Sequence, residues 1–90
     1  MARADMLSME QGRSVIMGGS ADAYFELGLK YSTGRDVATD LVTAHKWFNL
    51  ASLKGNQAAK AYRAEIASEL SKADIAHAQK LAREHLQKRG

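Results

Sequence analysis

The chain has 90 residues, enough for one small domain and no more. It contains no cysteine, which excludes disulfide bonds and cysteine-ligated metals, and no proline that would interrupt a helix. The net charge of +3 arises in residues 72–90, which hold five basic and two acidic side chains.

Residues 1–19 are predicted to form a partly ordered N-terminal arm. The arm could form a short helix or an extended segment, because Gly12 weakens a helix and Gly18-Gly19 ends any element before them. Its apolar side chains would cover one open end of the domain. The arm lacks the continuous apolar run of a signal peptide, and no stretch approaches membrane-spanning length. We therefore expect a soluble, cytoplasmic protein with no membrane partner.

Residues 20–55 are predicted to form two antiparallel helices. Ser20 suits the N-cap of the first, and Gly34 suits the left-handed position after its last turn. The core face of the first helix is expected at Ala23, Tyr24, Leu27, Gly28 and Tyr31. Gly28 lowers helix propensity, which close approach by a partner helix would explain. The second helix follows an N-cap at Asp40 or Thr39, ends at Gly55, and presents Leu41, Ala44, Trp47, Phe48 and Ala51.

Two further helices are predicted in residues 56–88. Asn56 and Ser71 are their expected N-caps. The apolar face of the third helix is expected at Ala59, Tyr62, Ile66 and Leu70, and that of the fourth at Ile75, Ala78, Leu81, Ala82 and Leu86. The spacing of Lys80, Glu84 and Lys88 predicts two weak ion pairs on the solvent side of the fourth helix.

One set of spaced residues runs through the first hairpin into the third helix: Ala23, Leu27, Gly28, Tyr31, Gly34, Val37, Asp40, Ala44, Trp47, Phe48, Ala51, Gly55 and Ala59. In order and spacing this set resembles one Sel1-like repeat, a relative of the tetratricopeptide repeats. Asp36 stands where that family usually has a second loop glycine, and Asp tolerates the left-handed conformation better than most residues.

The resemblance implies an all-α fold of antiparallel helix hairpins, about four helices long, which is a fragment of an α/α solenoid of the TPR/Sel1 type. The repeat would span residues 21–59 and a divergent helical cap residues 60–88, within a single helical domain at 20–90. Because stacked repeats usually need about three units to bury a continuous core, a self-sufficient four-helix domain and a homodimer are both open. The resemblance also implies a role in protein–protein interaction.

The chemistry-bearing side chains do not form a recognisable catalytic or cofactor motif. His45, His77 and His85 lack the spacing of a metal site, so packing or surface roles are favoured. Trp47 and Phe48 are favoured as core residues over a ligand pocket. We expect neither an enzyme nor a cofactor.

The first helix also carries Phe25 and Leu29 on the flank away from Leu27. In tetratricopeptide-like arrays the first helix of each pair lines the concave surface. Phe25 and Leu29 are therefore the predicted apolar anchors for a protein or peptide partner, with Glu26 and Lys30 as the polar rim. The open alternative is that the arm at 1–19 or the C-terminal helix covers these residues.

The alternative function is binding of nucleic acid or an acidic partner through the basic last helix, residues 72–90. Its predicted basic face consists of Lys80, Arg83, Lys88 and Arg89. No aromatic platform accompanies these cations, and cations also complement the C-terminal end of a helix. Nucleic acid is therefore the less favoured partner.

Overall fold

The computed structural model describes residues 21–89. They form four helices: α2 (Ala21–Thr33), α3 (Leu41–Leu53), α4 (Gln57–Ala67) and α5 (Lys72–Arg89). No strand occurs in this part of the chain, so the all-α prediction is confirmed for it. Within the same range, no helix has the length and apolar character needed to cross a membrane. The predictions for the arm at 1–19 and for Ser20 as an N-cap lie outside the described residues.

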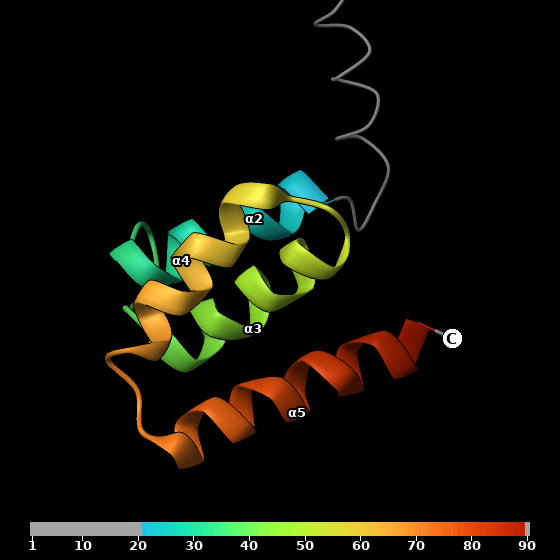
Figure 1. Cartoon of the computed structure of the whole chain (residues 1–90). Coiled ribbons are helices and arrows are strands. Elements are labelled where there is room, and N and C mark those ends of the chain that lie inside the picture. Colours follow the sequence, from blue (N-terminus) through green and yellow to red (C-terminus); the bar gives the residue numbers. More distant parts are fainter. Residues whose placement is uncertain (1–20, 90) are drawn as a thin grey trace, which may run out of the picture.

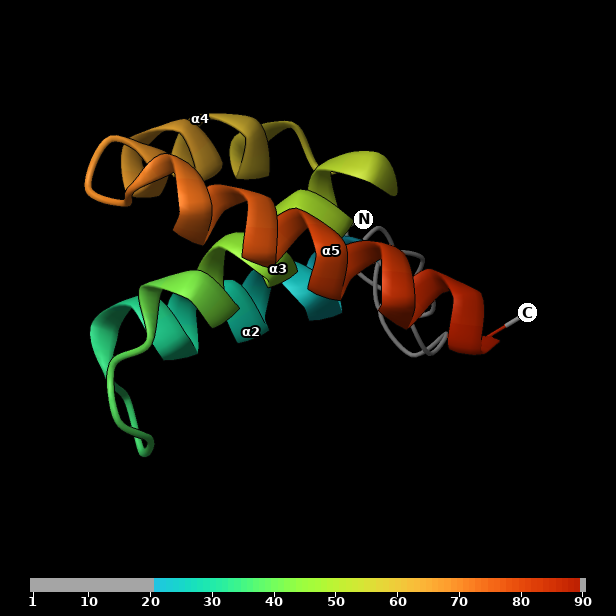
Figure 2. The same cartoon turned by 90° about the horizontal axis from the view of Figure 1, so that it is seen from below.

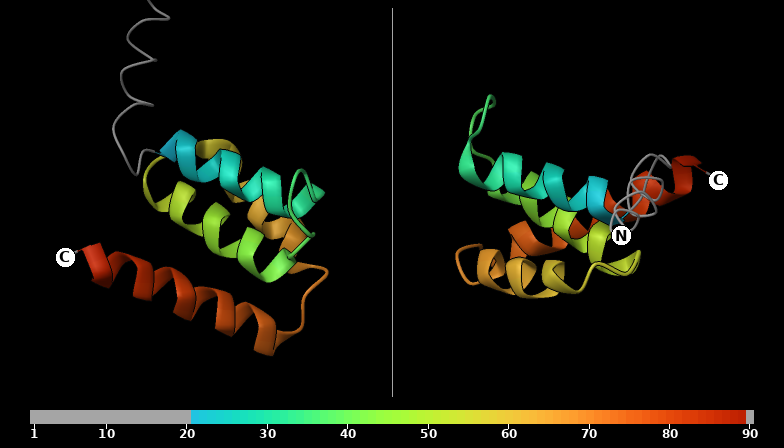
Figure 3. Two further views of the ribbon diagram at one scale, coloured as in Figure 1. Left: turned by 180° about the vertical axis from the view of Figure 1, so that it is seen from behind. Right: turned by 90° about the horizontal axis from the view of Figure 1, so that it is seen from above.

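Helix α3 is the central element, because α2, α4 and α5 all pack against it. Figure 1 shows α2 and α4 on one side of α3 and α5 on the other, and α5 lies in front in the view of Figure 2. The chain reverses direction from α2 to α3 and again from α3 to α4, whereas α5 runs alongside α3 in the same general direction (Figures 1 and 3). Helices α4 and α5 are consecutive but make almost no contact with each other. They therefore do not form a second hairpin like that of α2 and α3.

The α2–α3 hairpin depends on one close contact. A Cβ atom at Gly28 would lie 2.5 Å from ring carbons of Phe48, so only a glycine permits the observed approach of the two helices. Gly28 is buried and Phe48 is fully buried. The sequence-based explanation of Gly28 is therefore confirmed.

The turns and caps follow local chemistry. Gly34 and Asp36 adopt the left-handed conformation, with φ values of 73° and 64°. Asp40 is the N-cap of α3 and accepts hydrogen bonds from the backbone N–H of Thr43 at 3.1 Å and from its hydroxyl at 2.8 Å. These two bonds lower the pKa of the Asp40 carboxyl, since they stabilise its charged form.

The two later helices are capped as predicted. The side chain of Asn56 accepts a hydrogen bond from the backbone N–H of Ala59 at 2.9 Å. The hydroxyl of Ser71 accepts one from the backbone N–H of Asp74 at 3.0 Å. Gly55, after the end of α3, has a φ of 108°. The helix starts at Asp40, Asn56 and Ser71 were thus correctly predicted.

Small residues dominate the core around α3. Alanines at the helix contacts are almost completely buried, and these are Ala44, Ala51, Ala59, Ala78 and Ala82. Phe48 and Leu50 are the largest fully buried side chains. Because α5 packs against α3, the buried pair Ala78 and Ala82 allows the two helices to approach closely.

Two details of the sequence analysis are wrong. Leu27 is only half-buried and lies outside the core cluster. Phe25 and Leu29 pack against the core cluster instead, because α4 covers the flank of α2 that carries them. Neither Lys80 nor Lys88 comes within ion-pair distance of Glu84 in the described part of the chain. Exposed pairs of this kind contribute little in any case.

Candidate partner-binding surfaces

The predicted apolar anchors lie between α2 and α4. The Phe25 ring packs edge-on against Tyr62 of α4, with ring centroids 5.2 Å apart and an interplanar angle of 87°. Both rings also contact Phe48 from α3, at 5.7 and 5.4 Å. Phe25 is half-buried and belongs to the packing around the core, while Tyr62 remains 40% exposed.

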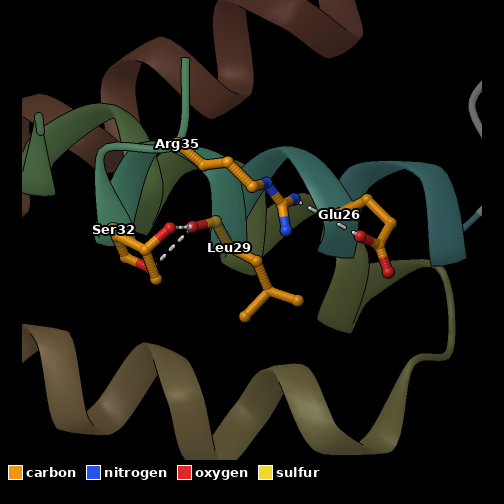
Figure 4. A network of polar contacts seen from close by, with 5 residues as sticks. Glu26, Leu29, Ser32 and Arg35 are labelled. Atoms are coloured by element: carbon orange, nitrogen blue, oxygen red, sulfur yellow. Dashed lines mark hydrogen bonds and ion pairs between the residues drawn. The ribbon is translucent and has the colours of Figure 1, made fainter. Parts of the chain in front are cut away.

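Leu29 lies one turn further along α2 and is also half-buried against the core. Figure 4 shows its side chain directed toward α4. Its backbone carbonyl accepts hydrogen bonds from the hydroxyls of Ser32 at 3.2 Å and Thr33 at 2.7 Å, which fix the last turn of the helix. Phe25, Leu29 and Tyr62 together form what we call the α2–α4 surface.

The predicted polar rim has two different environments. Glu26 is exposed and forms an ion pair with Arg35 at 3.8 Å (Figure 4). Both side chains are more than half exposed, so the pair contributes little to stability. Lys30 is half-buried, and its carbonyl accepts from the backbone N–H groups of Gly34 and Arg35.

Tyr62 is the member of this surface that sequence reasoning missed. Its spacing with Ala59 and Ile66 placed it on the core face of α4, and those two neighbours are indeed buried. Tyr62 extends past the core instead and covers Phe25. Helical periodicity marks the correct face of α4 but does not show how far a long side chain reaches beyond the core.

A second aromatic cluster joins three helices. The Trp47 ring of α3 stacks on Tyr24 of α2 at 5.6 Å and meets His85 of α5 edge-on at 5.3 Å. The Tyr24 hydroxyl lies 3.2 Å from Nε2 of His85. Trp47 is half-buried and packs against the core, and its Nε1 is buried without a hydrogen-bond partner. The core role predicted for Trp47 and Phe48 is therefore confirmed.

The three histidines occupy different environments. His45 is 3% exposed, and its Nδ1 has no hydrogen-bond partner. Burial lowers the pKa of His45, and the positive charge of Arg63 lowers it further. His77 is exposed, and His85 lies in the aromatic cluster. Among residues 21–89 no three His, Asp or Glu side chains gather as metal ligands would.

The predicted basic face lies on α5, where Lys80, Arg83 and Lys88 are all exposed. The side chain of Arg89 is outside the described part of the structure. A further cation on α3 was not predicted: the ammonium group of Lys46 lies 4.3 Å from the centre of the Trp47 ring. Burial lowers the pKa of Lys46, and the charge of Lys88 adds to this shift. The charge of Lys88 on α5 thus acts on Lys46 of α3, an influence that the sequence spacing does not indicate.

Comparison with known proteins gives no relative. No protein-family model, no curated protein and no solved structure matches this chain.

Proposed function

We propose that this chain is a small protein–protein interaction module that binds a protein or peptide through the α2–α4 surface. Phe25, Leu29 and Tyr62 form the apolar centre, and Glu26 and Lys30 form the polar rim. The observation that carries the proposal is the 40% exposure of Tyr62, an aromatic side chain supported from below by Phe25. Partly exposed, well-supported aromatic side chains are enriched among the residues that dominate binding energy.

We further propose that the fold is a TPR/Sel1-like solenoid fragment with one complete repeat. The α2–α3 hairpin supports this, because three residues of the repeat pattern have structural roles in it. Gly28 permits the close approach of the helices, Gly34 takes the left-handed turn position, and Asp40 caps α3. In such arrays the first helices of successive pairs line one surface; α2 is the first helix of its pair, and α4 takes the next such position although it does not pair with α5. The arrangement of α5, which packs on α3 instead of α4, departs from a regular array.

Binding energy on this surface would come from apolar burial, at about 25 cal/mol per Å² before ordering costs are subtracted. The supporting side chains Phe25 and Leu29 already pack against the core, so little ordering is needed when a partner binds. Their truncation would also weaken the fold. Tyr62 is therefore the better position for a test.

The test compares Tyr62→Ala with Tyr62→Phe in affinity capture by the purified chain, followed by quantitative mass spectrometry. A partner of this surface should be captured by the unmodified chain and by Tyr62→Phe, which keeps the ring, and lost with Tyr62→Ala. Lys60→Ala, at an exposed position of the same helix, is the control for general effects. Equal capture by Tyr62→Ala and the unmodified chain, with both folded by circular dichroism, would contradict the proposal.

The same variants decide whether the partner is a second copy of the chain. Light scattering gives the mass in solution. A dimer formed through this surface should become a monomer in Tyr62→Ala and remain a dimer in Tyr62→Phe.

A further inference from the structure

One side of α3 lies between α4 and α5. Val42, Lys46, Asn49 and Leu53 are spaced by four, three and four residues, which places them on one face of the helix. We call this face the α3 stripe. Helices α4 and α5 both pack on α3 but hardly touch each other (Figure 1). On the α3 stripe, Leu53 is 62% exposed and the other three side chains are half-buried.

Cations from three helices lie on or near this stripe. From α4, Nη1 of Arg63 donates to Oδ1 of Asn49 at 2.8 Å. From α3, Lys46 lies over the Trp47 ring. From α5, Lys88 follows one turn after His85, whose ring contacts that same tryptophan. None of the three cations forms an ion pair with a carboxylate of the described residues.

The charges of these residues act on their neighbours. The pKa of Lys46 is lowered first by burial and then by Lys88, and the pKa of His45 is lowered first by burial and then by Arg63. In both cases the charged neighbour that shifts the pKa is a cation. Because these cations lie on or beside the stripe and none pairs with a carboxylate of the described residues, the α3 stripe has a positive potential that an anionic group would stabilise.

We propose that the α3 stripe binds an acidic segment of a partner protein, whose carboxylates lie among Lys46, Arg63 and Lys88 and whose apolar side chain covers Leu53. Arginine suits a carboxylate because its planar fork donates two parallel hydrogen bonds, and Asn49 engages only one of its nitrogen atoms. The exposed Leu53 favours a peptide over a nucleic-acid backbone, since a peptide can pair carboxylates with an apolar side chain. This site is separate from the α2–α4 surface and does not rest on it.

The test uses two fluorescein-labelled probes, a short peptide of alternating glutamate and leucine and a single-stranded oligonucleotide of equal charge, with binding measured by anisotropy. We expect the acidic peptide to bind and the oligonucleotide to bind at least about tenfold more weakly. Lys46→Gln and Arg63→Gln should each raise the Kd of the peptide by about tenfold. Trp47 is the one tryptophan of the chain, so its emission should change when a bound carboxylate draws Lys46 off the ring.

The matched control is Lys80→Gln, which removes the same charge from an exposed position of α5 outside the stripe. Its Kd should change by less than about twofold. Equal weakening by Lys80→Gln and Arg63→Gln would overturn the proposal, because the attraction would then be a property of the net charge. Tighter binding of the oligonucleotide, or no peptide binding by the folded chain, would overturn it as well. Tyr62→Ala should leave peptide binding unchanged, which separates this site from the α2–α4 surface.

Discussion

Gly28 sets the distance between the two helices of the hairpin. A Cβ atom there would lie 2.5 Å from Cδ1 and Cε1 of Phe48, far inside van der Waals contact. We expect Gly28→Ala to lower the free energy of unfolding by about 1–3 kcal/mol through overpacking, although alanine raises helix propensity by about 1 kcal/mol. Urea unfolding followed by circular dichroism measures the change.

The cause is tested by a double-mutant cycle with Phe48→Leu, which replaces the ring by a smaller side chain. If the clash is responsible, the two substitutions together should destabilise the chain by less than the sum of their separate effects. Simple additivity would show that Gly28→Ala acts on α2 alone.

His45 makes stability depend on pH. Its pKa in the folded chain lies below the ordinary value of 6.5, so between these two pKa values the unfolded chain binds more protons than the folded chain. Above pH 6.5 the free energy of unfolding should be insensitive to His45, and it should fall as the pH falls below 6.5. His45→Leu should remove this part of the pH dependence, as measured by urea unfolding across the pH range.

The control is His77→Gln, because His77 is exposed; if it removed the same part of the pH dependence as His45→Leu, burial of His45 would not be the cause. The same slope in the unmodified chain and in His45→Leu would show that other groups cause it. The sequence identified His45 as a packing or surface residue, and the structure shows that it is buried.

At the scale of elements, features that rest on neighbouring residues were predictable. The caps at Asp40, Asn56 and Ser71 each hold a backbone N–H three residues further on. The left-handed positions of the first loop follow equally from local chemistry, since Gly34 and Asp36 tolerate a positive φ better than most residues.

The loop conformation at Asp36 gives a sharp test. Asp36→Gly should keep or raise the free energy of unfolding, because glycine adopts a φ of 64° without strain. Asp36→Val should lower it by about 1–2 kcal/mol, since a β-branched residue is strained in this region. Ala38→Val is the matched control, because Ala38 is exposed in the same loop and is not a positive-φ position. A loss of stability in Ala38→Val as large as that in Asp36→Val would mean that φ is not the cause.

The choice of packing partner could not be predicted from the sequence. The apolar face of α5 was assigned correctly at Ala78 and Ala82, yet periodicity shows only that a face is buried and not which helix covers it. The same limit explains the candidate surfaces. Phe25 and Leu29 were chosen from spacing, whereas the packing of Tyr62 on Phe25 and the Arg63–Asn49 hydrogen bond depend on contacts between separate helices.

At the scale of the whole molecule, α3 is the helix against which α2, α4 and α5 all pack, and these three helices make few contacts with one another. Removal of any one helix exposes part of the same core. Such an arrangement favours one cooperative unfolding transition. The two proposed binding surfaces also share this helix as their support, through Phe48 on one side and Asn49 on the other.

Trp47 reports on this cooperativity, because it contacts α2 and α5 at once. In the unmodified chain, tryptophan fluorescence and far-ultraviolet circular dichroism should change at the same urea concentration. Ala82→Glu places a charge at a position that is 1% exposed against α3, so α5 should detach first. The fluorescence transition of this variant should then move to lower urea than the circular dichroism transition. Ala76→Glu, at an exposed position of α5, should keep the two transitions together. Coincident transitions in Ala82→Glu would show that the α2–α3 hairpin cannot remain folded without α5.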